Sequence, residues 1–86
     1  MMWSRRIIDE RIAFMDKMLA IRFSRLLKVT RKKKKFTQER LAELADLSVI
    51  HIQRLEGRSP SGVTLETLIK LSKAFKISLP VFLKDL

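Results

Sequence analysis

The sequence predicts an all-α protein, and three observations support that fold class. Helix-forming residues such as Leu, Ala, Lys, Arg and Glu are abundant, whereas the 86 residues include only two glycines, two prolines and no tyrosine. No glycine or proline occurs before Gly57, so the first third of the chain can be helical without interruption. Apolar residues recur at helical spacing. Because a chain of this length supports one hydrophobic core, we expect a compact five-helix bundle.

The first predicted element is a long helix from about Ile7 to Lys33, which would span roughly 40 Å at 1.5 Å per residue. Its apolar residues form two stripes. One stripe comprises Ile8, Ile12, Met15, Leu19, Phe23 and Leu26, and the other comprises Ile7, Phe14, Met18 and Ile21. The first stripe can cover the domain formed by residues 23–86. The second needs a partner, so we expect residues 1–22 to form an N-terminal helical extension that makes the contact of a homodimer.

The positive charge is concentrated in the N-terminal part of the chain. The net charge is +10, and residues 1–35 carry 12 Lys and Arg against 3 Asp and Glu, whereas residues 36–86 carry 7 against 6. This excess of positive charge favours a polyanionic partner such as a nucleic acid, because cationic side chains that bind its phosphates release counterions. Charge alone does not separate this from an anionic membrane surface. For the run Arg31–Lys35, phosphate contact and a solvated helix end favoured by the helix dipole both remain open.

Four short helices are predicted after Phe36, and each follows a residue that can cap its N-terminus. These caps are Thr37 before QERLAELA, Ser48 before VIHIQRLE, Thr64 before LETLIKLSKAF, and Ser78 before LPVFLKDL. Pro80 falls in the first turn of the last helix, where its missing N–H costs nothing. The short connections favour an orthogonal bundle. The residues expected in its core are Leu41, Leu44, Leu47, Ile52, Leu55, Leu65, Leu68, Leu71, Phe75, Ile77, Phe82 and Leu83.

Residues 37–57 have the spacing of a helix-turn-helix unit, with about eight residues of helix, a short turn and a second helix. Ala42 lies where the two helices must approach closely, and Leu47 fills the turn. In the second helix Ile52 and Leu55 face the core, and the presented face holds Val49, Ile50, Gln53 and Arg54. A face of this kind reaches base edges in the major groove, so we expect these four residues to read DNA bases.

A coordinated series of residues runs through this unit and beyond it. The series reads Phe36-Thr37-Gln38-Glu39-x-Leu41-Ala42-x-x-Ala45, then Leu47-Ser48-x-x-x-Ile52-x-x-Leu55-Glu56, then Thr64-Leu65-Glu66-Thr67-Leu68-x-x-Leu71, and ends in Ile77-Ser78-Leu79. In these residues the chain resembles the phage repressor/Cro-type helix-turn-helix family, often called XRE-like, over about three quarters of its length from Phe23. The resemblance implies a lambda-repressor-like bundle that binds double-stranded DNA.

The resemblance also implies roles for individual residues. Gln38 matches a glutamine that bonds a DNA phosphate, and Arg31 and Glu56 match a structural pair that ties the first helix to the end of the recognition helix. The usual base-reading positions are matched by Val49, Ile50 and Arg54, with Gln53 and His51 beside them. The further residues expected at the phosphate backbone are Ser48, Arg58, Ser59, Lys34 and Lys35.

Two features of this unit depart from the family pattern. Asp46 replaces the turn glycine, and Asp tolerates the left-handed conformation that the turn requires. Val49 and Ile50 replace polar residues that usually read bases. Specificity would then rest on thymine methyl contacts and on Arg54, for which a bidentate pair with guanine is worth about 1–3 kcal/mol. Alternatively, the apolar pair forms a surface that binds another protein.

Enzymatic activity is the least supported function. His51 is the only histidine and the chain has no cysteine, so we expect no metal and no other cofactor. No Ser-His-Asp set or phosphate-cradling glycine loop is present. Charged residues interrupt the N-terminal segment, so we expect neither an export signal nor a membrane span.

We therefore expect a cytoplasmic repressor that binds a palindromic operator as a homodimer and reads a particular DNA sequence. One alternative is an antitoxin-type regulator that binds a toxin protein as well as DNA. The other is a protein-interaction module that has lost base reading, which the apolar residues Val49 and Ile50 would favour.

Overall fold

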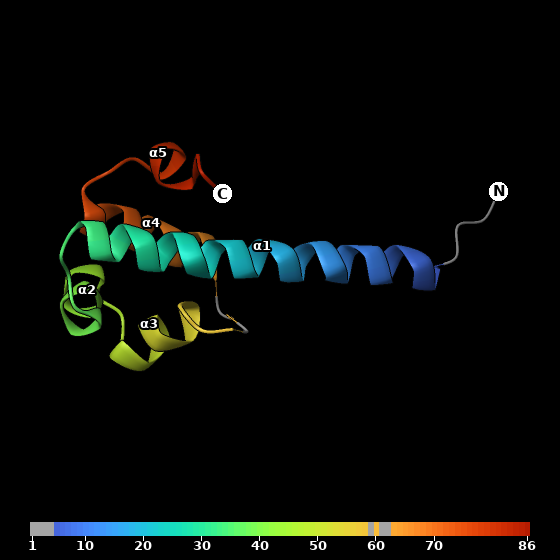
Figure 1. Ribbon diagram of the computed structural model, residues 1–86, viewed down its shortest axis with the longest axis horizontal. Helices are drawn as coiled ribbons and strands as arrows, with labels where there is room; N and C mark the ends of the chain where they lie inside the picture. The colour runs from blue at the N-terminus through green and yellow to red at the C-terminus, as the bar shows by residue number, and fades with distance from the viewer. Residues whose placement is uncertain (1–4, 59, 61–62) are drawn as a thin grey trace.

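The computed structural model describes the chain except for residues 1–4, 59 and 61–62, and it describes the side chains of the first helix from Asp16 onward. Within the described residues the chain forms helices and no strands, so the predicted all-α class is confirmed. The helices are α1 (Arg5–Lys33), α2 (Gln38–Ala45), α3 (Val49–Leu55), α4 (Leu65–Phe75) and α5 (Leu79–Leu83). The four short helices pack around the C-terminal half of α1 (Figure 1).

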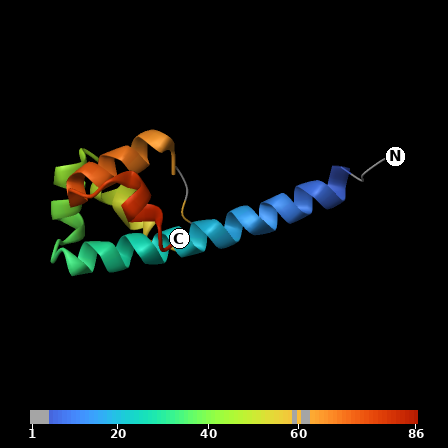
Figure 2. The ribbon, with the colours of Figure 1, turned by 90° about the horizontal axis from the view of Figure 1, so that it is seen from above.

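The length of α1 gives the molecule its elongated shape. The structure measures 52 × 25 × 20 Å, and α1 runs along the longest dimension, with its N-terminal half projecting away from the body (Figure 2). The helix begins at Arg5, slightly before the predicted start, and continues without a break to Lys33. Along its first apolar stripe, Phe23 is buried, whereas Leu19 is 47% exposed. Among the described side chains of this stripe, burial in the core begins at Phe23.

The four predicted N-caps are confirmed. The side-chain oxygens of Thr37, Ser48, Thr64 and Ser78 each accept a hydrogen bond from a backbone N–H in the first turn of the following helix. The bond from Arg40 N to Thr37 Oγ1 measures 3.0 Å, as does the bond from His51 N to Ser48 Oγ. Such caps satisfy donors that the helix cannot satisfy itself, and each contributes about 1 kcal/mol.

Three helices are followed by residues in the left-handed conformation, which normally favours glycine. Lys35 has φ 60°, Asp46 has φ 56° and Lys76 has φ 58°. The predicted left-handed turn at Asp46 is thus confirmed. The backbone N–H groups of Asp46 and Leu47 return to the last carbonyls of α2, with Leu47 N 2.9 Å from Ala42 O. These bonds end α2 and redirect the chain toward α3.

The core lies where α1 meets the short helices, and aromatic rings are central to it. Phe82 contacts Phe23 edge-on with ring centroids 6.2 Å apart, and it contacts Phe75 at 5.4 Å. Phe36 stacks on Phe75 at 6.3 Å. The buried apolar residues are Phe23, Leu27, Leu41, Ala42, Ala45, Ile52, Leu55, Leu71, Ala74, Phe75 and Phe82.

The predicted core was wrong at two leucines. Leu44 is 39% exposed and Leu65 is 65% exposed. The buried face of α2 is formed by Leu41, Ala42 and Ala45. Leu44 lies at the edge of that face, and Leu65, the first residue of α4, precedes the residues that α4 buries. Four further residues of the expected core are only partly buried and pack against the core from its edge: Leu47, Leu68, Ile77 and Leu83.

Candidate nucleic-acid interface

The helix-turn-helix unit consists of α2, the turn 46–48 and α3. Ala42 is buried where α2 packs, and Leu47 is half-buried and packs against the core from the turn. Ser48 then begins α3 by capping it. Because both ends of the turn are held by hydrogen bonds, the orientation of α3 relative to α2 is determined by the backbone as well as by side-chain packing.

One face of α3 is buried and the other is exposed. Ile52 and Leu55 are fully buried, as predicted. On the opposite face Gln53 and Arg54 are exposed, and Ile50 is 61% exposed.

Val49 and His51 are the two half-buried residues of α3. Val49, which we expected on the exposed face, is half-buried and packs against the core. Val49 lies one turn before Ile52, so both side chains point inward. His51 is half-buried. The exposed face of α3 is therefore narrower than its sequence indicated.

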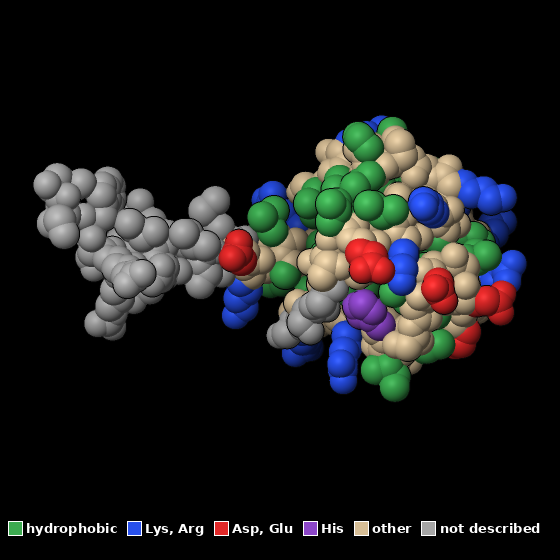
Figure 3. Space-filling model, turned by 180° about the vertical axis from the view of Figure 1, so that it is seen from behind, with side chains coloured by type: hydrophobic (Ala, Val, Ile, Leu, Met, Phe, Trp, Pro, Cys, Tyr) green, Lys and Arg blue, Asp and Glu red, His purple; other side chains and the backbone are tan. Residues whose placement is uncertain are grey.

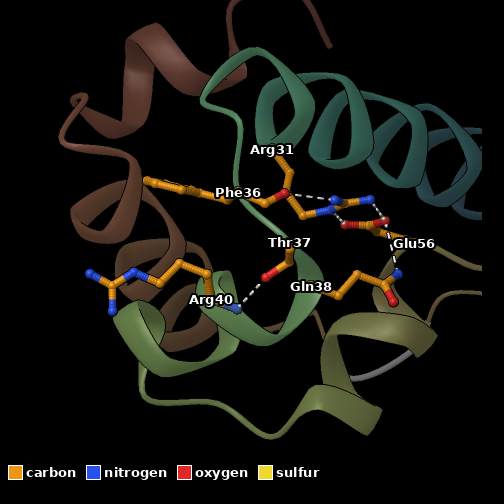
Figure 4. Close-up of polar contacts among 6 residues, drawn as sticks. All are labelled: Arg31, Phe36, Thr37, Gln38, Arg40 and Glu56. Carbon is orange, nitrogen blue, oxygen red and sulfur yellow. Dashed lines mark hydrogen bonds and ion pairs between the residues drawn. The ribbon is translucent and has the colours of Figure 1, made fainter.

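A buried hydrogen-bond network ties α1 to the end of α3 (Figure 4). Arg31 Nε donates to Glu56 Oε2 at 2.6 Å and Arg31 Nη2 donates to Glu56 Oε1 at 3.0 Å. The third contact of the guanidinium, from Nη1, goes to the carbonyl of Phe36 at 2.8 Å. Gln38 Nε2 donates to Glu56 Oε1 at 3.2 Å. The arginine–glutamate pair that the resemblance implied is thus present, and it also holds the loop before α2.

The charges in this network compensate one another. The hydrogen bond to Glu56 raises the pKa of Arg31, burial lowers it, and the negative charges of Glu56 and Glu39 raise it, so that the net shift is upward. The guanidinium is therefore always protonated. Since the Glu56 side chain is only 3% exposed and both its oxygens accept hydrogen bonds, its negative charge is largely neutralised at the end of α3.

A family model for helix-turn-helix proteins matches residues 27–82, which is about two thirds of the chain. The chain belongs to the XRE-like helix-turn-helix family. The match begins within α1 and ends in α5, so it includes the whole α2–turn–α3 unit. No curated protein matches the chain. This family binds DNA and regulates transcription, and it is not a family of enzymes. The XRE-like protein is therefore a DNA-binding transcription regulator.

In the XRE-like protein, the residues that we expect to contact DNA phosphates lie before α2, at the starts of α2 and α3, and after α3. Lys34 and Lys35 are exposed in the loop that precedes α2. Gln38 begins α2 and is half-buried, with its amide nitrogen held by Glu56. Ser48 is exposed, and its oxygen already accepts the capping hydrogen bond. Arg58 is exposed after α3, and Ser59 lies outside the described residues.

The residues expected at a dimer contact lie on α1 from Ile7 to Ile21, and Ile21 lines a groove with Gly57 and Arg58 of the body. Met18 is 42% exposed and Ile21 is half-buried. The side chains of Ile7 and Phe14 lie outside those that the structure describes, although the backbone of both residues is helical. Met18 and Leu19 are consecutive, so the XRE-like protein exposes apolar side chains on two sides of α1 at this point.

Two cations near the end of α3 were not predicted from the sequence. Arg25 and Lys28 are exposed on α1 and line a groove that also borders Gly57 and Arg58. Their three-residue spacing in the sequence, after Arg22, places basic side chains along one side of α1. The spacing does not reveal which neighbouring element that side approaches.

The described residues form neither a cluster that could hold a metal ion nor a helix that could cross a membrane. In the part of the chain that the structure describes, no three His, Cys, Asp or Glu side chains come together to hold a metal ion. None of the described helices combines the length and apolar character needed to cross a bilayer.

Proposed function

We propose that this XRE-like protein is a sequence-specific repressor that binds a palindromic operator as a homodimer. The observation that carries the proposal is the exposed face of α3, which is held by a buried network at its C-terminal end and by a capped turn at its start. A rigid helix with one exposed face is what major-groove reading requires.

The residues assigned to base reading are Ile50, Gln53 and Arg54. Arg54 can bond guanine through two parallel N–H donors, and Gln53 can pair with adenine in the same bidentate way. The exposed Ile50 suits contact with a thymine methyl group. Val49 contributes instead to packing, because it lies against the core.

Contacts to the phosphate backbone are assigned to groups around this face. The free backbone N–H groups at the start of α2, beginning at Gln38, favour an anion. Lys34, Lys35 and Arg58 add positive charge on the two sides of the helix-turn-helix unit. Ser48 adds a hydroxyl that can donate to a phosphate while its oxygen caps α3.

The homodimer is assigned to the projecting part of α1. Beside this part lies an apolar groove of about 350 Å³. Its lining residues are Leu19, Ala20, Phe23, Pro60, Val63, Leu68, Leu83 and Leu86. Figure 3 shows hydrophobic side chains gathered on this face of the body. The first apolar stripe of α1 leads into this groove at Leu19 and Phe23. Met18, from the second stripe to which we assign the dimer contact, is exposed next to Leu19 in the sequence. A second copy of the same helix is the partner that suits a second apolar stripe.

The decisive experiment is selection of bound DNA from a random pool by the full chain. A sequence-specific dimer enriches an inverted repeat whose half-sites share one preferred sequence. Enrichment of a single half-site that is not repeated would contradict the homodimer but would still support base reading. Recovery of no common sequence would contradict base reading and favour the protein-interaction alternative, for which the exposure of Ile50 is the supporting observation.

A further inference from the structure

A groove of about 460 Å³ lies between α1 and the residues that end α3. It is lined by Ile21, Ser24, Arg25, Lys28, Glu56, Gly57 and Arg58. The groove thus joins one side of the long helix to the start of the loop after the recognition helix. This arrangement brings residues from two distant parts of the sequence to one surface.

The groove carries net positive charge. Arg25, Lys28 and Arg58 are exposed, and none of them forms an ion pair with another described residue. The one carboxylate in the groove belongs to Glu56, and its charge is compensated by Arg31. The hydroxyl of Ser24 donates within α1 to the carbonyl of Ile21 at 2.8 Å. Three cations therefore remain available to an external anion.

The groove borders the residues that follow α3. Ile50 and Arg54 are four residues apart and lie on one side of the helix. Arg58 lies four residues after Arg54 but outside α3, where the N–H of Gly57 bonds the carbonyl of Arg54 at 3.1 Å. Because Arg58 is this close to Arg54 along the chain, a duplex that contacts Arg54 can bring its sugar-phosphate backbone to Arg58, and α1 forms the other wall of the groove there.

We propose that this groove binds a backbone phosphate of the DNA duplex that α3 contacts, with Arg25 and Lys28 as phosphate-binding residues on α1. The inference rests on the proposed DNA-binding function and extends the DNA contact from the helix-turn-helix unit onto the long helix. The ligand chemistry is a phosphodiester, because cations on long side chains neutralise phosphate charge without reading bases. These contacts add affinity and salt dependence but no sequence preference.

The test compares two charge-matched double variants of the full chain. Arg25→Gln/Lys28→Gln removes two cations from the groove. The control, Lys73→Gln/Lys84→Gln, removes two exposed cations elsewhere, since Lys73 lies on α4 and Lys84 follows α5. Dissociation constants are measured at salt concentrations from about 50 to about 200 mM, for the selected operator and for a duplex of random sequence. Urea unfolding midpoints verify that both variants are folded.

We expect the slope of log affinity against log salt to become shallower by about 0.9 per bound protomer in Arg25→Gln/Lys28→Gln, and so by about 1.8 for a bound dimer, because each protomer no longer neutralises one DNA phosphate. The control should retain the slope of the natural protein, and the preferred DNA sequence should not change. Equal slopes in the two variants, on both duplexes, would overturn the inference. If the protein prefers no sequence but the slopes still differ, base reading fails and the groove assignment stands.

Discussion

Arg31 is the residue on which the geometry of the helix-turn-helix unit depends most. Its guanidinium donates to Glu56 at the end of α3 and to the carbonyl of Phe36 in the loop before α2. A planar group with several donors satisfies both partners from a single position on α1. Lysine, with one ammonium nitrogen, cannot reproduce this set of bonds.

Replacing Arg31 tests how much of the stability depends on this network. Arg31→Met leaves the buried carboxylate of Glu56 without its cation, so we expect the free energy of unfolding to fall by about 3 kcal/mol in urea denaturation. The double variant Arg31→Met/Glu56→Leu removes both charges and should recover most of that loss. A single variant as stable as the natural protein would show that the pair contributes little.

Arg54 and Gln38 have different predicted roles in DNA binding. Arg54→Ala should weaken binding to the selected operator by about 1–3 kcal/mol and relax the preference at one base position. Gln38→Ala should weaken all sequences more evenly, because it acts at the phosphate and through Glu56. Fluorescence anisotropy on operators with each base substituted measures both effects, with Lys73→Ala on α4 as the control. Unchanged binding in both variants would contradict the assignments.

At the scale of the helices, the ends are defined by local interactions. Each short helix begins at a capping hydroxyl, and α2 and α4 end at residues with positive φ. These features connect residues at most five positions apart, so they form largely independently of the rest of the fold. Lys76 is the less favourable of the two left-handed residues, because lysine lacks the short polar side chain that lets Asp46 adopt this conformation.

The left-handed conformation at Lys76 predicts a stabilising substitution. Lys76→Gly removes the steric cost of φ 58° and should raise the free energy of unfolding by about 1 kcal/mol. The matched control is Lys73→Gly, three residues earlier and inside α4, which should lower it by about 1 kcal/mol. Urea denaturation measures both changes. Destabilisation by both glycines would show that Lys76 stabilises the fold through its side chain.

At the scale of the whole molecule, the two halves of α1 lie in different environments. Its C-terminal half contributes Phe23, Leu27 and Arg31 to the body, and its N-terminal half projects beyond the body (Figure 1). A helix that is apolar on two sides suits the proposed contact with a second copy of the chain. The long helix also carries much of the positive charge, so it can contribute to DNA affinity even though the proposed reading face lies on α3.

Removal of residues 1–22 tests the proposed dimer contact. The remaining chain keeps the part of α1 that is buried in the core, so we expect a folded monomer in sedimentation equilibrium where the full chain is a dimer. Its helical circular dichroism spectrum provides the folding control. The shortened chain should also bind a single half-site with lower affinity than the full chain binds a palindrome. A dimer that persists after truncation would place the contact on another surface.

The helix starts, the capped turn and the Arg31–Glu56 pair could be predicted from the sequence. Caps and turns depend on residues close together in the chain, and the pair was implied by the resemblance to the family. The orientation of Val49, Leu44 and Leu65 could not be predicted. Each lies at the border of a helical face, where periodicity does not indicate which side a neighbouring element will cover.

Other contacts between residues far apart in the sequence could not be predicted either, because they depend on how the helices pack. Composition and spacing along α1 indicated an excess of positive charge, but the proximity of Arg25 and Lys28 to Arg58 depends on how α1 packs against α3. The amide of Gln38 meets Glu56 for the same reason. Local hydrogen bonding and side-chain periodicity thus specify the helices and the helix-turn-helix unit. Packing between distant segments specifies the exposed reading face and the basic groove beside it.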